Sequence, residues 1–476
     1  MSFIMYDIAL LVIFVVFIAI FLYRRKKNLR KEGLLFLYRT SWGIKLINRV
    51  GDKFKHTLNF FCYVAIGLGY LLMGAMLYLF GKIVWIYVLN PEIVRAIKIP
   101  PIMPLIPYLP QAFKLNFLPP FYFVYWILII AIIAIVHEFA HGIFASRKGV
   151  GIKNTGFGFF PFFLPIFLAA FVELDEDKMK KKSIFSQMSV LAAGTFANVM
   201  TGILFFGLMW LFFSLAFVPA GVNFDAYTYS MVDVGNITSV GGVDFEGGTY
   251  ESLYNLVAED GLVKVMVGEG SFVVTRGFLD VQQNNLNYVL LYDDAPAVNA
   301  GLDGAITKIN GVGIGSKEEL GEELSGYSPG DAITVTTVVN EDVKTHNLVL
   351  GEHPDNENVG FLGIGFANQE ASGGLLGRVV SALSSLKKPH TYYESKFEAG
   401  IFIYNLLWWL VLISFSVALV NMLPVGIFDG GRFFYLTVLA LTGKEKIAKG
   451  AFSIMTKLFL VLLVVIMIFW AKSFFG

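Results

Sequence analysis

Six long apolar segments constrain what this chain can fold into. A helix needs about 20 mostly apolar residues to cross the roughly 30 Å hydrocarbon core of a bilayer. Six stretches of the 476-residue sequence approach or exceed this length, namely Ile8–Tyr23 extended by Met1–Tyr6, 58–81, 119–145, 183–224, 399–428 and about 452–471. The sequence therefore predicts a polytopic α-helical membrane protein with about six transmembrane helices, surrounded by membrane lipid.

The composition supports this class and excludes others. Hydrophobic residues make up 56% of the chain and charged residues only 15%, whereas about a quarter of an ordinary soluble domain is charged. The formal net charge is +1, so the basic excess typical of nucleic-acid binding is missing and no nucleic-acid partner is expected. Cys62 is the only cysteine, which excludes a disulfide within the chain.

The distribution of basic residues predicts the orientation. Positive charges follow the first apolar segment instead of preceding it, which favours a retained anchor over a cleaved signal peptide. Lysine and arginine are frequent in 24–57, in 146–182 and after residue 428, but sparse in 89–118. Because basic loops stay on the cytoplasmic side, we expect those three segments on the cytoplasmic side of the cell membrane and both termini on its outer side.

Residues 225–397 form a predicted extracytoplasmic insertion with a different composition. Turn residues and alternating β-formers replace the apolar runs, as in Asp331–Val339. Gly235–Phe245 aligns with Gly304–Ile314, and a helix-like stretch follows each, which indicates an internal repeat. The expected organisation is an anchor with a basic loop (1–57), a membrane core (58–224), the β-rich insertion (225–397) and a second membrane part (398–476).

The second copy of the repeat carries a recognisable pattern. The sequence Gly304-Ala-Ile-Thr-Lys-Ile-Asn-Gly311, followed by Pro329-Gly-Asp331 and Phe361-Leu-Gly-Ile364, resembles bacterial-type PDZ domains over about 290–367. The stretch 226–290 is interpreted as a divergent second unit. PDZ domains add a peptide strand to a sheet edge, so the resemblance implies a bound peptide or chain terminus. The alternative is a small β-rich region without a peptide-binding role.

A cluster of polar residues stands in the third apolar segment. In His137-Glu138-Phe-Ala-His141 two imidazoles at positions i and i+4 share one helical face and can bind one metal ion. The glutamate between them can act as general base toward a metal-activated water. Ionisable groups at membrane depth are costly, so this cluster indicates function. A proton relay or an interhelical hydrogen-bond cluster is the alternative.

A third zinc ligand is expected from another segment at the same depth. Asp429 follows the fifth apolar segment and lies on the predicted cytoplasmic side, as the histidines do. Pro424 and the pair Gly430-Gly431 interrupt the helix there. Broken backbone is tolerated at membrane depth where it lines a cavity. The two elements together therefore predict a zinc site made by His137, His141 and Asp429.

At this point the chain resembles the site-2 protease family of intramembrane zinc metalloproteases, of the peptidase M50 type. The matching motifs are His137-Glu138-x-x-His141 and Asn421-x-x-Pro424-x-x-x-x-Asp429-Gly430. The resemblance implies a Zn²⁺ cofactor. It also implies the site residues, which are His137, His141 and Asp429 as zinc ligands, Glu138 as catalytic base, and Asn421 and Pro424 as substrate-binding residues.

Two further segments are similar to that family. Ala193-Gly194-Thr195-Phe-Ala-Asn198 resembles its Ala-Gly-Pro-x-x-Asn motif, with Thr195 in place of the proline. The apolar stretch from Gly156 to Glu173 contains Pro161 and Pro165, so a re-entrant hairpin or membrane-dipping strand is expected instead of a straight span. Family members place a substrate-binding β-element in this region.

The function predicted from these features is intramembrane endoproteolysis. A zinc metalloendopeptidase of this kind cleaves transmembrane segments of single-pass membrane proteins, as in regulated intramembrane proteolysis, with the active site toward the cytoplasm. The first alternative is a catalytically inactive receptor or scaffold with a structural zinc site and a PDZ-like peptide-binding region. The second alternative is a transporter with a proton relay, which predicts inverted repeats among the spans, and none is visible.

Overall fold

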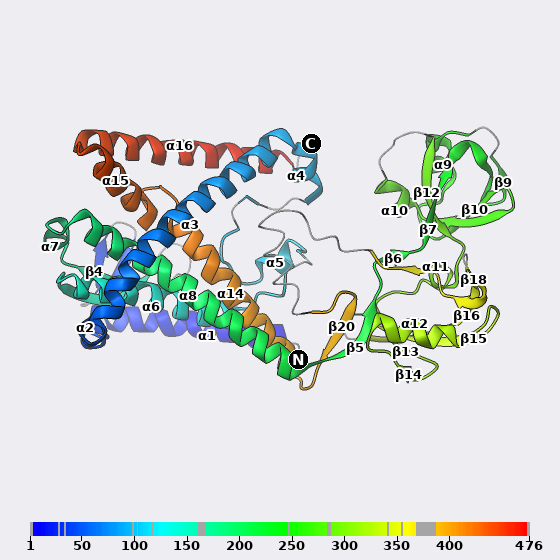
Figure 1. Ribbon diagram of the computed structural model, residues 1–476, viewed down its shortest axis with the longest axis horizontal. Helices are drawn as coiled ribbons and strands as arrows, with labels where there is room; N and C mark the ends of the chain where they lie inside the picture. The colour runs from blue at the N-terminus through cyan, green and yellow to red at the C-terminus, as the bar shows by residue number, and fades with distance from the viewer. Residues whose placement is uncertain are drawn as a thin grey trace. The chain divides into compact units, whose positions relative to one another are not determined.

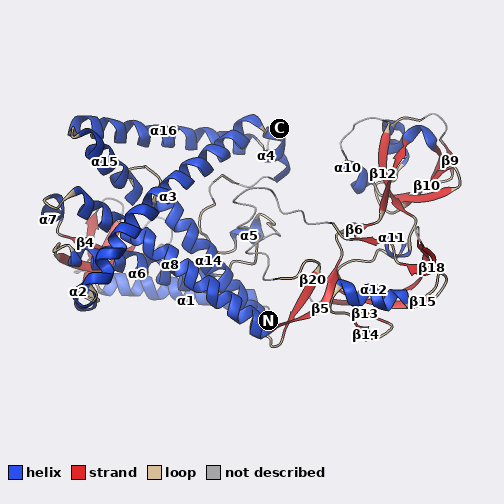
Figure 2. Ribbon diagram, viewed as in Figure 1, coloured by secondary structure: helices blue, strands red, loops and turns tan. Residues whose placement is uncertain are grey.

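A computed structural model of the protein consists of two compact units. One unit combines Met1–Phe212 with Ile401–Gly476, and the other is Phe213–Gly400. The residues it describes are 3–26, 29–32, 35–97, 100–101, 103–115, 118–159, 168–245, 248–282, 287–339, 342–353, 356–367 and 387–473. Figure 2 shows that the first unit is mainly helical and that strands dominate the second.

The helical unit confirms the predicted membrane spans. Among the described residues, six helices are long and apolar enough to cross a bilayer. They are α1 (Phe3–Arg24), α3 (Lys55–Leu89), α6 (Phe123–Arg147), α8 (Ile184–Ala216), α14 (Gly400–Asn421) and α16 (Glu445–Lys472), all labelled in Figure 1. Shorter helices connect them, namely α2 (Ile44–Lys53), α4 (Pro91–Ile97), α5 (Leu109–Ala112), α7 (Glu176–Lys180) and α15 (Asp429–Thr442).

Helix α6 is the element around which the helical unit packs. Helices α1, α2 and α3 and two strands contact it. Its buried side chains recur at helical spacing from its first turn to its last, as Trp126, Ile129, Ile133, His137, Ala140 and Phe144. This spacing places them along one face. The buried face therefore carries the histidine motif among large apolar side chains.

A four-stranded antiparallel sheet lies in the helical unit. It has the order β1 (Leu29–Glu32), β2 (Leu35–Thr40), β3 (Ile152–Phe159) and β4 (Leu168–Leu174). The expected β-element between the third and fourth spans is thus the hairpin β3–β4, although Pro161 and Pro165 lie outside the described residues. Strands β1 and β2 were not anticipated, because the basic loop after α1 carries little β-pattern of its own.

The inserted unit contains the predicted repeat. The first copy runs β8 (Ile237–Val240), β9 (Val243–Asp244), α9 (Tyr250–Leu256), β10 (Val263–Val267) and β11 (Gly270–Val274). The second copy runs β13 (Ala305–Ile309), β14 (Val312–Gly313), α12 (Lys317–Ser325), β15 (Ala332–Val339) and β16 (Asp342–Val349). Each copy has its own buried core, so the two are separate packing units.

Local chemistry explains why both copies fold alike. The turns before β9 and β14 are Gly241-Gly242 and Asn310-Gly311, and all four residues have positive φ. Two-residue hairpin turns of type I′ need this backbone conformation. Thr249 caps α9 and Ser316 caps α12, each by accepting a hydrogen bond from the third backbone N–H of its helix. The repeat is therefore encoded by turns and caps as well as by apolar spacing.

The two copies belong to different sheets. The first joins β7 (Tyr229–Asp233) and β12 (Tyr288–Asp293) in the order β7-β12-β11-β10-β8-β9. The second extends from β13 to β5 (Phe217–Asn223) and β20 (Thr391–Ser395), which adjoin α8 and α14 in the chain. The inserted unit consequently begins before residue 225, because β5 completes its sheet and the fourth span ends at Ala216. The short strands β6 (Ala226–Tyr227) and β19 (Ile364–Gly365) form a further pair.

One buried carboxyl group fixes the start of α6. Asp7 of α1 is 3% exposed and accepts hydrogen bonds from the backbone N–H of Phe123 at 2.7 Å and of Val124 at 3.0 Å. The Tyr108 hydroxyl donates to the same carboxyl group at 2.5 Å. The first N–H groups of a helix have no partner within the helix. A side chain from another span therefore supplies the cap of the helix that carries the histidines.

We expect Asp7→Leu to destabilise the helical unit. The substitution leaves the N–H groups of Phe123 and Val124 buried without acceptors, which costs roughly 1–3 kcal/mol for each group. The midpoint of denaturant unfolding in mixed micelles measures the loss. Val12→Leu is the matched control, since Val12 lies on the same helix and is 55% exposed. An unfolding midpoint unchanged in both variants would show that the cap does not contribute to stability.

Candidate active site

The histidine motif lies within the last three turns of α6. His137 and His141 are 7% and 8% exposed, and their Nε2 atoms are 3.0 Å apart. The i, i+4 spacing on one helical face explains this proximity. Apolar residues around the motif favour the helix, because it satisfies the backbone hydrogen bonds of the segment internally. The sequence-predicted pair is therefore brought together as expected.

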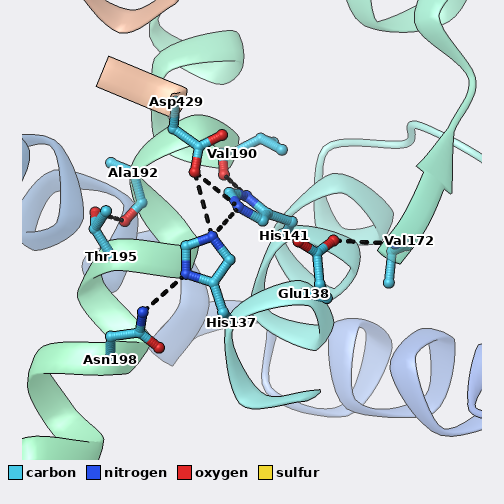
Figure 3. Close-up of polar contacts among 9 residues, drawn as sticks. All are labelled: His137, Glu138, His141, Val172, Val190, Ala192, Thr195, Asn198 and Asp429. Atoms are coloured by element: carbon cyan, nitrogen blue, oxygen red, sulfur yellow. Dashed lines mark hydrogen bonds and ion pairs between the residues drawn. The ribbon is translucent and has the colours of Figure 1, made fainter. Parts of the chain in front are cut away.

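Asp429 reaches the same point from the far end of the chain. It is the first residue of α15, and its Oδ2 lies 3.3 Å from Nε2 of both His137 and His141. Figure 3 shows the carboxylate above the two rings, with dashed lines to both. Helix α14 ends at Asn421, and the chain turns over 422–428 before α15 begins. This turn carries Asp429 back onto the histidines.

The glycines after Asp429 permit that turn. A Cβ on Gly430 would lie 2.3 Å from the carbonyl carbon of Met422, and one on Gly431 would lie 2.3 Å from the carbonyl oxygen of Val425. Contacts this close with backbone cannot be relieved by rotating a side chain. The first turn of α15 can pack against the preceding loop only because both positions lack a side chain. The sequence motif Asp-Gly-Gly is thus explained by close approach.

The three facing atoms have the spacing that zinc requires. A tetrahedral zinc ion with bonds of about 2.0–2.1 Å separates its ligand atoms by about 3.3 Å. The separations here are 3.0, 3.3 and 3.3 Å. A Cβ on Gly194 of α8 would lie 2.5 Å from Nε2 of His141, so the missing side chain leaves room beside the cluster. Two imidazoles and one carboxylate also form an ordinary zinc donor set.

Glu138 lies beside this triangle and is held differently. One of its carboxylate oxygens and one ring nitrogen of each histidine all lie within 4.8 Å of one another. Its Oε2 accepts a hydrogen bond from the backbone N–H of Val172 at 3.0 Å. Asp429 is the nearer carboxylate to both Nε2 atoms, so it suits the third ligand position better. One carboxylate oxygen of Glu138 is therefore held by a hydrogen bond from β4, next to the cluster.

Helix α8 supports both imidazoles from behind. Nδ1 of His141 lies 2.7 Å from the carbonyl oxygen of Val190, and Nδ1 of His137 lies 3.0 Å from Nδ2 of Asn198. Asn198 was noticed in the sequence only through the family resemblance. The Val190 carbonyl and the Val172 N–H were missed, because backbone groups leave no signature in the sequence.

A cavity of about 360 Å³ opens next to the cluster. His137, Glu138, Asn421 and Asp429 line it, and its other lining residues are apolar, among them Ile129, Ile133, Ala170, Ile413, Val417 and Ile427. Leu105 also lines it, from the segment between α4 and α6, and sequence reasoning did not anticipate this. Of the two residues predicted to bind substrate, Asn421 lines the cavity. Pro424 is buried in the α14–α15 turn and is not among the lining residues.

A bidentate ion pair joins the sheet to the helix of Asp429. The two terminal guanidinium nitrogens of Arg432, in the first turn of α15, each lie 3.1 Å from a different carboxylate oxygen of Glu176. Glu176 begins α7, which directly follows β4. The pair is partly exposed, so its contribution to stability is modest. Its geometric effect is to tie the strand beside Glu138 to the helix that carries Asp429.

Comparison with known proteins agrees with this arrangement. The sequence matches peptidase family M50 over residues 125–466, which includes the histidine motif, the inserted unit and Asp429. It is also similar to the zinc metalloprotease RasP of Shouchella clausii (strain KSM-K16), with 27% identity over 202 residues, or 36% of this chain and 48% of that protein. The chain thus spans about half the length of this curated relative. Because the family match extends over most of the sequence, the chain belongs to peptidase family M50.

Proposed function

We propose that the protein is a zinc-dependent endopeptidase that cleaves peptide bonds of membrane proteins within or beside the bilayer. The observation that carries this proposal is the triangle of His137, His141 and Asp429, with separations of 3.0–3.3 Å, facing a cavity next to Glu138. These three residues are the proposed zinc ligands. When bound, zinc supplies a Lewis acid that polarises a carbonyl group and makes water a better nucleophile.

Glu138 is the proposed general base. Its carboxylate lies beside the ligand atoms and lines the cavity, so it can accept the proton of the attacking water. The hydrogen bond from Val172 restricts the orientation of its side chain. Asn421 lines the same cavity, and its amide is the proposed contact for the substrate backbone. Pro424 is proposed to act through the turn, by fixing where Asn421 and Asp429 point.

The edge of β4 is the proposed docking strand for the substrate. β4 stands at the end of the described four-stranded sheet and pairs there with β3. Residues of an antiparallel strand direct their N–H and C=O groups alternately to its two edges. The N–H of Val172 points away from β3, toward Glu138, so Ala170, two residues earlier, directs its groups to the same edge. An extended substrate segment can add there as a further strand.

The lining of the cavity favours an apolar substrate segment. Leu105, Ile130, Ile133, Ile413 and Val417 surround the space beside the ligand cluster. Apolar walls of this kind can receive an apolar side chain from lipid without leaving a polar group unpaired. A transmembrane segment of a single-pass protein, locally unwound so that its backbone can pair with β4, is therefore the proposed substrate class. This is the chemistry of regulated intramembrane proteolysis.

The proposed location follows from charge and from the insertion. The basic segments 24–57 and 146–182 adjoin the ends of α1 and α6, which favours a cytoplasmic position for the ligand cluster. The inserted unit is then extracytoplasmic. Its second copy, with the PDZ-like pattern, is proposed to bind a peptide or chain terminus of the substrate outside the membrane, and so to select substrates without taking part in the chemistry.

Metal binding and catalysis should separate in two variants. Purified wild-type protein should contain about one zinc per chain, as the ligand set requires, and His137→Ala should lose most of it. Glu138→Gln should keep zinc but lose roughly 10²–10⁴-fold in the rate of substrate cleavage, because the amide cannot take up a proton. His56→Ala is the control, since His56 is exposed at the start of α3. Normal turnover by Glu138→Gln would show that Glu138 is not the general base, whereas absence of cleavage by zinc-loaded wild-type protein would favour the inactive receptor.

The role of the β4 edge should appear in Ala170→Pro. Proline removes the N–H group at this edge, and each lost hydrogen bond is worth about 0.5–1.5 kcal/mol. We expect kcat/KM to fall by roughly 2- to 12-fold, with zinc content unchanged, whereas Ala170→Ser keeps the N–H and should cleave normally. Equal rates for both Ala170 variants would argue against strand addition.

Deleting 226–367 leaves every cluster residue in place, so cleavage should persist with altered selectivity.

The orientation is testable by cysteine labelling in intact cells. Cys62 is buried, so the background should be low. Lys26→Cys and Lys444→Cys, both at exposed positions, should react with a membrane-impermeant maleimide only after the membrane is opened. Val312→Cys, at a position that is 49% exposed in the inserted unit, should react from outside. The reverse pattern would place the ligand cluster at the outer face.

A further inference from the structure

Asn198 is a buried polar residue that is only half paired. It is 0% exposed on α8, and its Oδ1 has no hydrogen-bond partner among the described residues. Its Nδ2 lies 3.0 Å from Nδ1 of His137. Asn198 is not among the residues that line the cavity. A buried polar atom without a hydrogen-bond partner destabilises the folded protein, so a role other than stability is expected for Asn198.

The tautomer of His137 explains why an amide lies at this position. Nε2 of His137 faces Nε2 of His141 and Oδ2 of Asp429, so it is the nitrogen that must offer a lone pair to a metal. A neutral imidazole then carries its proton on Nδ1, which must donate a hydrogen bond. Only the oxygen of the Asn198 amide can accept it. The oxygen and nitrogen of an amide exchange places by a half-turn about the last bond.

The neighbouring histidine has the same arrangement with a backbone partner. Nδ1 of His141 lies 2.7 Å from the carbonyl oxygen of Val190, which can only accept, so Nδ1 carries the proton and Nε2 is free. Val190, Gly194 and Asn198 follow one another at intervals of four residues and therefore share one face of α8. Gly194, in the middle, provides the space that lets this face approach both rings. Figure 3 shows Val190 and Asn198 beside the two rings.

We propose that Asn198 is a positioning residue which, in the metal-bound protein, turns its Oδ1 to Nδ1–H of His137 and holds this ligand in the tautomer that leaves Nε2 free. The inference rests on the proposed zinc site. It assigns α8 a defined task, since one helical face then fixes the tautomers of both histidine ligands. Outer hydrogen bonds of this kind orient ligands, and their loss commonly costs 10–100-fold in metal affinity.

The test measures metal affinity without relying on activity. Zinc binding to the full-length protein in detergent is determined by competition with a chromogenic chelator, and Co²⁺ is used as a spectroscopic probe. Asn198→Leu, of similar size but without an acceptor, should weaken zinc binding by about 10–100-fold and alter the visible Co²⁺ spectrum. Asn198→Asp keeps the acceptor and should bind zinc within a few-fold of wild type. Thr201→Val, which alters another buried polar residue of α8, is the matched control.

Stability of the metal-free protein separates positioning from packing. If Asn198 serves only the fold, Asn198→Leu should lower the thermal midpoint of the metal-free protein. If it serves the metal, removing a half-paired buried amide should leave that midpoint unchanged or raise it, while zinc affinity falls. Asn198→Ala replaces the leucine variant if that protein does not accumulate.

Each result has a defined meaning. Wild-type affinity and spectrum in Asn198→Leu, or equal losses in the Leu and Asp variants, would overturn the inference while leaving the proposed function intact. Failure of the wild-type protein to bind zinc would instead overturn the proposed function. Weak binding in Asn198→Leu with recovery in Asn198→Asp would support the positioning role.

Discussion

The need to pair polar groups inside an apolar helical unit governs this structure. Helix α6 carries such groups at both ends, and each end finds its partners in a distant part of the chain. At the start, Asp7 of α1 accepts the hydrogen bonds of the first backbone N–H groups. At the end, the imidazoles contact Asp429, the Val190 carbonyl and Asn198. Because unpaired groups are costly in this environment, these contacts hold the spans α1, α6 and α8 and the helix α15 in one arrangement.

The same constraint explains the broken backbone beside the cluster. Asp429 can reach the histidines only if α14 stops and the chain reverses, and Ile427 and Phe428 of the connecting loop line the cavity, where broken backbone is tolerated at membrane depth. Gly430 and Gly431 make the reversal possible by close packing. The Arg432–Glu176 pair then ties the new helix to the end of β4. Ligand, base and strand edge are thereby connected through a few short contacts.

The inserted unit is stabilised by different interactions. Its two copies are stabilised by separate apolar cores, by helix caps and by turns with positive φ. Its second sheet is completed by β5 and β20, which continue directly into or from the spans α8 and α14. The residues of the ligand cluster all belong to the helical unit, and the β-rich unit contributes none of them. This division suits the proposal that it recognises substrates while the helical unit performs the chemistry.

The sequence by itself determined the spans, the repeat and the zinc-type motif, because each depends on local patterns. Apolar length predicts a membrane helix, the i, i+4 spacing of His137 and His141 predicts a shared face, and the similarity of Gly235–Phe245 to Gly304–Ile314 predicts a repeated unit. Asp429 was found because it follows a span on the same predicted side. Tertiary structure alone decided the rest. The cap by Asp7, the pairing of β2 with β3, the entry of Leu105 into the cavity and the contacts of Val172 and Val190 join residues distant in sequence. Backbone groups and long-range packing form these contacts, and neither leaves a periodic signal that a single sequence can reveal.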